Sequence, residues 1–215
     1  MDITYLGHAS FFIKTKPATI LTDPFDPKMV GLPFPKKQAD IVTISHEHAD
    51  HNYRADLGEN TFILDWPGEY EKNSVRIFGF STFHDKEKGA KRGTNTMFKF
   101  EVEDLAVLHC GDLGHILEDQ LVEEIGDVDA LMIPTGGFYT IDAKDAAKVV
   151  KEIDPAIVIP MHYNHEKLNQ ETFSQLSPVS AFIEELGEEV EYVDTLSIRK
   201  IDINPEATRL VVFKL

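Results

Sequence analysis

The chain has little of what disulfide scaffolds, secreted proteins and membrane proteins require. Its 215 residues include one cysteine, Cys110, which excludes an internal disulfide. The apolar runs at 156–161 and 210–213 are far shorter than a membrane span. The N-terminus lacks the basic start and long apolar stretch of a secretory signal, and no lipidation motif is present. We therefore expect a cytoplasmic protein with no membrane partner.

Basic residues are scarce relative to acidic ones. The 21 Lys and Arg are outnumbered by 37 Asp and Glu, which gives a formal net charge of -16 at pH 7. Such a charge opposes binding to the phosphate backbone of nucleic acids, so we expect a small-molecule partner instead. The composition is otherwise that of a globular enzyme, with 13 Gly and 11 Pro spread along the chain. We expect one domain over 1–215 and make no prediction of oligomeric state.

Periodicity predicts strands in the first half of the chain. Short apolar runs bounded by turn residues predict strands at 10–14, 19–22 and 41–44. Between residues 97 and 103 apolar and charged side chains alternate, and a turn at Glu103 and Asp104 leads to a return run at 106–109. This pattern predicts a hairpin with one face toward solvent.

The second half alternates helical and strand patterns. Helices are predicted at 117–125, 142–153 and 179–186, with Asp142 as a cap and Gly126 and Gly187 as terminators. Apolar runs at 128–133 and 157–160 bracket the middle helix, as a strand–helix–strand unit requires. We therefore expect an α/β fold: a four-layer αββα sandwich of two mixed sheets with helices on the outer faces.

A dense group of metal-type ligands directly follows the strand predicted at 41–44. Within six residues the chain places His46, His48, Asp50 and His51. Residues two apart in an extended chain point the same way, so His46 and His48 can reach one ion, while Asp50 and His51 can reach a second. Imidazole and carboxylate are ligands of zinc-type cations, and the absence of cysteine ligands opposes a structural zinc site. A solvent-facing loop with incidental histidines is the alternative, but such crowded groups would repel protons and each other without a cation.

Further ligands are expected at the ends of later strands. His84, Asp112 and His162 each follow an apolar run, although singly each has a structural explanation as a satisfied histidine or a capping aspartate. His109 competes with His84 for one position. Residues 109 and 112 leave opposite faces of a continuous strand, unless a bulge intervenes near Gly111, so strand parity favours His84.

The ordered pattern HxHxDH, a lone His, Gly-Asp and a late Pro-Met-His resembles the metallo-β-lactamase superfamily. The stretches at 5–8, 67–70, 92–95 and 111–115 resemble its small Zn-dependent hydrolase subfamily, which is related to ascorbate-phosphate lactonases. The resemblance implies two divalent ions, with zinc favoured over manganese or iron. It also implies that the first ion is held by His46, His48 and His84, the second by Asp50, His51 and His162, and that Asp112 bridges both.

Other residues are candidates for contact with the substrate. The segment 85–92 contains four basic and two acidic side chains and directly follows the predicted metal ligand His84. It can therefore place Arg92 or Lys91 over an anionic substrate. A solvated loop is the alternative. Tyr139 is a candidate oxyanion donor, and His8 and His115, in glycine-flanked turns, are candidates to orient a ligand or to bind substrate.

These features predict a metal-dependent hydrolase. Two cations would lower the pKa of a bridging water and polarise the carbonyl or phosphoryl oxygen of a small anionic ester, lactone or phosphodiester. Asp112 would hold the metals and water, and Asp50 is a candidate proton acceptor if it is bound through one oxygen. Two alternatives stay open: redox chemistry at a di-iron centre and a non-catalytic, metal-dependent binding module. Cys110 as a nucleophile is less favoured than Cys110 as a small buried hydrophobe.

Overall fold

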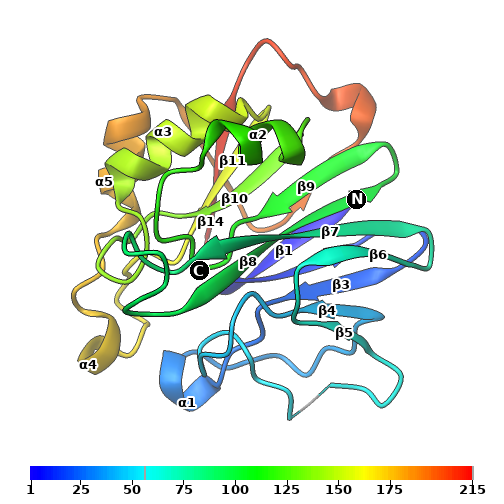
Figure 1. Cartoon of the computed structure of the whole chain (residues 1–215), viewed down its shortest axis with the longest axis horizontal. Helices are drawn as coiled ribbons and strands as arrows, with labels where there is room; N and C mark the ends of the chain where they lie inside the picture. Colours follow the sequence, from blue (N-terminus) through cyan, green and yellow to red (C-terminus); the bar gives the residue numbers. More distant parts are fainter. Residues whose placement is uncertain (56, 215) are drawn as a thin grey trace.

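Two mixed β-sheets stack face to face in the computed structural model, which describes residues 1–55 and 57–214 (Figure 1). The first sheet has the order β13 (Leu196–Ser197), β1 (Asp2–Gly7), β2 (Ser10–Lys14), β3 (Thr19–Thr22), β4 (Ile41–Thr43) and β5 (Phe62–Leu64). Strands β13 to β3 pair antiparallel, and β3, β4 and β5 pair parallel.

The second sheet has eight strands. Its order is β12 (Val190–Val193), β14 (Arg209–Phe213), β11 (Ile157–Met161), β10 (Ala130–Pro134), β9 (Leu105–His109), β8 (Thr94–Val102), β7 (Val75–Phe83) and β6 (Gly68–Lys72). The strands from β12 to β9 pair parallel, and those from β9 to β6 pair antiparallel. Strand β7 therefore runs in the same direction as β9 and β11.

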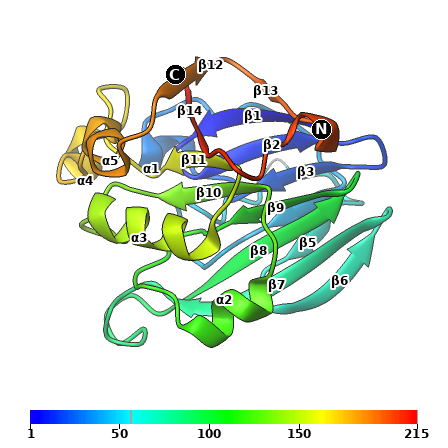
Figure 2. The same cartoon turned by 90° about the horizontal axis from the view of Figure 1, so that it is seen from above.

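The helices gather mainly on the outer face of the eight-stranded sheet (Figures 1 and 2). The helices are α1 (Pro27–Val30), α2 (Asp119–Ile125), α3 (Ala143–Ile153), α4 (Gln170–Phe173), α5 (Val179–Leu186) and the 3₁₀ turn η1 (Lys200–Asp202). Asp142 caps α3 by accepting the Asp145 amide at 2.9 Å, and α5 ends at Gly187 with φ 76°. Among the described residues, no helix has the length and apolar character needed to cross a membrane.

Strand parity builds the core between the sheets. Inward side chains of the six-stranded sheet, including Phe11, Ile20 and Ile41, share one buried cluster with Phe98 and Phe100 of β8. The alternate side chains face outward into a second cluster, which contains Leu21, Val42 and Ile44 and is covered by Phe34 and Leu57. The predicted four-layer architecture is confirmed. The outer layer over the six-stranded sheet consists largely of irregular chain and the short helix α1.

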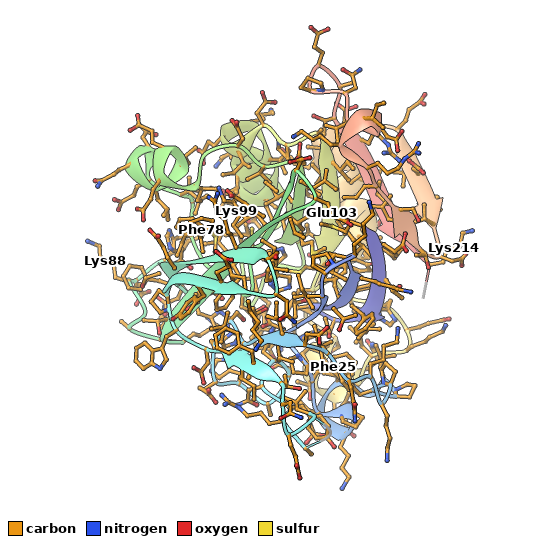
Figure 3. The ribbon with its side chains drawn as sticks, turned by 90° about the vertical axis from the view of Figure 1, so that its right-hand side faces the viewer. Phe25, Phe78, Lys88, Lys99, Glu103 and Lys214 are labelled. Atoms are coloured by element: carbon orange, nitrogen blue, oxygen red, sulfur yellow. The ribbon has the colours of Figure 1, made fainter. Side chains whose placement is uncertain are left out.

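The β8–β9 hairpin forms as predicted, but its solvent-facing side was predicted wrongly. Glu103 and Asp104 take φ values of 57° and 61°, as a two-residue hairpin turn requires. Lys99 is only 7% exposed: its ammonium donates to the Ile125 carbonyl at the end of α2 and lies 5.3 Å from the ring of Phe78 (Figure 3). The alternation of apolar and charged residues could not show that α2 covers this face of the hairpin.

The sheet directions bring the predicted ligands to one end of the sandwich. His46 to His51 follow the carboxyl end of β4, and His84, Asp112 and His162 follow the ends of β7, β9 and β11. Strands of common direction end at a common edge, so segments more than 100 residues apart in sequence meet there.

The core assignment predicts a large effect of truncating Phe98, which has 0% exposure. Phe98→Ala should lower the free energy of unfolding by about 3–5 kcal/mol, because it removes apolar contacts and leaves a cavity. Trp66→Ala, at a side chain that is 72% exposed, should change it by less than about 0.5 kcal/mol. Urea titration of both variants measures the difference, and equal stabilities would contradict the assignment.

Candidate metal centre

One oxygen of the Asp112 carboxylate lies at the centre of a buried group of imidazoles. The Oδ2 atom is 3.3 Å from the Nε2 atoms of His51, His84 and His162 and 3.9 Å from that of His46. Asp112 itself is 2% exposed. The geometry thus unites side chains that follow four separate strands.

The side chains form overlapping groups with metal-ligand spacing. Within each group the candidate ligand atoms lie within 4.8 Å of one another. The groups are His46, His48 and His84; Asp50, His51, His162 and His8; and His46, His51 and Asp112. The first two contain the two ligand sets implied by the sequence, the third links them through Asp112, and His8 is an additional member of the second.

Unpartnered buried atoms show that these residues fit metal ions. In the described part of the chain, the buried Nε2 atoms of His46, His51 and His162 and the Oδ1 atom of Asp112 have no hydrogen-bond partner. A buried polar atom without a partner is costly, and a cation would satisfy these lone pairs. Their convergence on one point is what a metal site requires.

The electrostatics also suit coordination. Burial lowers the pKa of His46 to about 3 and that of His84 to about 4, so both rings are neutral near neutral pH and their lone pairs are available. Burial alone would lower the pKa of His51, but the carboxylates of Asp112 and Asp50 raise it well above its usual value. A cation at this position would replace that proton.

Asp23 supports the 46–51 loop from behind, a role that the sequence analysis missed. Its buried carboxylate accepts the Ser45 amide at 2.8 Å and the Ser45 hydroxyl at 2.6 Å. Its Oδ2 atom also lies 2.8 Å from Nδ1 of His51. This contact fixes the ring so that Nε2 faces Asp112. The only sequence signal was its place in the turn that ends the strand 19–22.

Asn95 and Gly111 orient Asp112. The Asn95 Oδ1 atom accepts the Asp112 amide at 2.9 Å, and its Nδ2 donates to the Cys110 carbonyl at 2.9 Å. Gly111 has φ 54°, and a Cβ there would lie 2.4 Å from Asn95 Oδ1 and 2.5 Å from the Cβ of Ser45. Only glycine fits this turn. Sequence reasoning also missed Asn95.

The structure brings His84, and not His109, to the centre. His109 donates from Nε2 to the Ala9 carbonyl at 2.8 Å, and its Nδ1 accepts the Gly111 amide at 3.2 Å. Both ring nitrogens are therefore used by backbone groups. The neighbouring Cys110 is fully buried, which raises the pKa of its thiol and opposes a nucleophilic role.

A pocket of about 280 Å³ opens beside the metal ligands. It is lined by Met29, His48, Ala49, Asp50, His84, Arg92, Asp112, Tyr139, Thr172 and Phe173. The Arg92 guanidinium lies 5.5 Å from the ring of Tyr139. The Tyr139 hydroxyl donates its proton to the Thr172 carbonyl at 3.0 Å. This proton is therefore not free to stabilise an oxyanion, which was the predicted role of Tyr139.

The other candidate substrate contacts lie elsewhere. His8 is buried behind the ligands, with Nε2 3.1 Å from Oδ2 of Asp50. Lys91 is exposed and pairs with Glu87. His115 donates to the Ile116 carbonyl at 2.7 Å and accepts the Phe83 amide at 3.2 Å, so both of its nitrogens are used by backbone groups outside the pocket lining.

Comparison with known proteins places the chain in a family. A family model described as a beta-lactamase superfamily domain matches residues 2–162, and the chain belongs to this superfamily. A crystal structure from Thermotoga maritima, assigned as a Zn-dependent hydrolase of the metallo-beta-lactamase superfamily, is 38% identical with a TM-score of 0.81, covering 99% of this chain and 97% of that one.

Curated relatives agree with this placement. Metal-dependent hydrolases from Carboxydothermus hydrogenoformans and Methanopyrus kandleri are 29% and 28% identical, over 76% and 90% of this chain and 85% and 96% of their own lengths. The predicted superfamily is confirmed. The protein is a metal-dependent hydrolase of the metallo-β-lactamase superfamily with a histidine and aspartate metal-binding cluster.

The support from Asp23 can be tested by Asp23→Asn. The amide has a single acceptor oxygen for the three donors, so His51 should lose its fixed orientation and zinc affinity should fall by about 10–100-fold. Competition with a fluorescent zinc chelator measures the affinity. Asp194→Asn is the control, because the Asp194 side chain is 84% exposed and belongs to none of the candidate ligand groups among the described residues. Equal affinities for the two variants would contradict this role of Asp23.

The two competing histidines should behave differently when replaced. His84→Asn should lower the metal content, whereas His109→Asn should keep it and instead destabilise the fold by about 1–3 kcal/mol, since buried backbone groups lose their partner. Metal analysis by inductively coupled plasma and chemical denaturation separate these outcomes. Loss of metal from the His109 variant alone would reverse the assignment.

Proposed function

We propose that this chain hydrolyses a small anionic ester, lactone or phosphodiester with two divalent ions held around Asp112. The observation that carries the proposal is the position of Asp112 Oδ2, which is 3.3 Å from a nitrogen of each ligand set, in His84 and in His162. A carboxylate placed between two sets of imidazoles is suited to act as a ligand of both proposed ions. When bound, the two ions would lower the pKa of a water between them and polarise the scissile oxygen.

Asp50 serves this centre better as a ligand than as a proton acceptor. Its Oδ2 atom lies 3.1 Å from Nε2 of His8 and 3.6 Å from Nε2 of His51. Burial raises the pKa of Asp50, but His51 and His8 outweigh burial and lower it far below the usual value. Asp50 is therefore ionised near neutral pH, as a carboxylate that holds a cation must be.

The position of Arg92 favours the proposal that the substrate is anionic. It is the only lysine or arginine among the described residues that line the pocket, and none of the carboxylates in 1–55 and 57–214 forms an ion pair with it. A guanidinium can bind a carboxylate or phosphate through two parallel hydrogen bonds. Met29 and Phe173 give the same pocket an apolar wall for a carbon skeleton. A small molecule with one anionic group and an apolar part fits this combination.

Metal analysis tests the dinuclear centre. The imidazole and carboxylate set suits zinc and also accepts manganese or iron. We expect about two ions per chain after reconstitution with zinc, measured by inductively coupled plasma, with activity lost on chelation and restored by the metal. Protein that binds no metal and gains no activity with zinc, manganese or iron would overturn the proposal, and native iron with redox turnover would replace it.

The role of Arg92 is tested with two esters of similar size. Mono-4-nitrophenyl succinate carries a charge and 4-nitrophenyl butyrate does not. Arg92→Ala should raise KM for the succinate ester by about tenfold or more and leave that of the butyrate ester nearly unchanged, since one charge-assisted pair is lost. Lys88→Ala is the control, because Lys88 lies on the same loop and points away from the body of the protein (Figure 3). Equal KM changes for both esters would contradict the anionic site.

A further inference from the structure

Asp85, the residue after His84, is enclosed by the backbone of its own loop. It is 6% exposed, and none of the described lysines or arginines forms an ion pair with it. Its carboxylate instead accepts four backbone N–H groups at 2.8–2.9 Å. The donors are Glu87 and Gly89 to Oδ1, and Lys91 and Arg92 to Oδ2. One side chain thus fixes both ends of the 85–92 loop.

The base of this loop is attached to the metal-ligand segments. The His84 amide donates to the Gly93 carbonyl at 3.0 Å, and the Gly93 amide donates to the Gly89 carbonyl at 2.9 Å. Gly114, two residues after Asp112, approaches so closely that a Cβ there would lie 2.2 Å from the Asp85 nitrogen. Figure 2 shows the loop at the arrowhead end of β7, beyond the sheet. The loop is therefore set at a fixed place relative to His84 and Asp112.

Arg92 is the member of the loop that reaches the pocket. Its amide is held by Asp85 at 2.8 Å, and its guanidinium lies over Tyr139 at 5.5 Å from the ring centroid. On the outer side of the loop, Lys86 pairs with Asp145 of α3 at 2.6 Å. These contacts order a long, flexible side chain before any ligand arrives, and such ordering avoids an entropic cost on binding.

We propose that Asp85 is a positioning residue for substrate binding: it holds the 85–92 loop so that Arg92 stands over the metal centre and receives the anionic group of the substrate. The inference rests on the proposed function, because it assumes that Arg92 binds an anion. A carboxylate is required because four converging N–H donors need an acceptor-only group. The amide of asparagine would present its own N–H groups to two of them.

Binding of dicarboxylates to the zinc-loaded protein tests this role without requiring turnover. Malonate, succinate and glutarate are compared with acetate by isothermal titration calorimetry. One carboxylate can reach the metals while the other reaches Arg92, so wild type should bind the best-fitting dicarboxylate at least about tenfold more tightly than acetate. Asp85→Asn should lose this preference, and its acetate affinity and zinc content should equal those of wild type.

The double variant separates positioning from general destabilisation. If Asp85 acts through Arg92, Asp85→Asn should weaken dicarboxylate binding about tenfold in the wild-type background and less than about twofold in Arg92→Ala. Hydrogen exchange of the amides of 87–92 should speed up in Asp85→Asn and stay unchanged in Arg92→Ala. Glu87→Gln is the matched control, because it removes an exposed carboxylate of the same loop whose one ion-pair partner among residues 1–55 and 57–214 is Lys91.

Each outcome has one meaning. The positioning role would be overturned if the losses in the double variant were independent and additive. It would also be overturned if Asp85→Asn bound dicarboxylates like wild type while Arg92→Ala was impaired. Either result would leave the proposed function intact. A wild-type protein that does not prefer dicarboxylates, or an Arg92→Ala variant with full affinity, would overturn the anionic site and this inference with it. Asp85→Glu, which moves the carboxylate by one methylene, is the second variant and should show the same loss if Asp85→Asn does not fold.

Discussion

Several ionisable groups are buried around Asp112, and the rest of the structure is arranged to hold them there. Its carboxylate is 2% exposed and faces imidazoles from both sheets: His51 follows β4 of the six-stranded sheet, and His84 and His162 follow strands of the eight-stranded sheet. The site therefore spans the junction of the two halves of the sandwich. A cation bound there would link the halves as well as satisfy their lone pairs, so metal binding and packing of the sheets contribute to the same folded state.

Hydrogen bonds behind the ligands give the site its geometry. Asp23 fixes His51, Asn95 fixes the backbone of Asp112, and the His8 carbonyl accepts the His162 amide at 2.7 Å. Each support comes from a chain segment distant from the group it holds. These hydrogen bonds hold the ligand segments in place, while the inward nitrogens of the imidazoles stay available to bind a metal ion.

The sequence predicted those parts that depend on local pattern. The run 46–51 could be identified because its candidate ligands are adjacent in the sequence. Strand parity favoured His84 over His109, but β9 ends at His109 and Gly111 takes φ 54°, so the two histidines differ in the structure by their hydrogen bonds and not by strand face. Asp23, Asn95 and Asp85 were missed because their partners are mostly backbone groups or residues far along the chain, which no local pattern reveals. Lys99 was misplaced for the same reason, since its burial depends on packing beneath α2.

The 85–92 loop is closed by bonds within itself and between its two ends, through Asp85 and through His84 and Gly93. Its interior can therefore change in sequence with little effect on the strands that carry the metal ligands. In this architecture, the loop can be exchanged as a unit while the metal ligands at its base stay constant. If the loop binds the substrate as proposed, such an exchange would change the substrate without changing the metal centre.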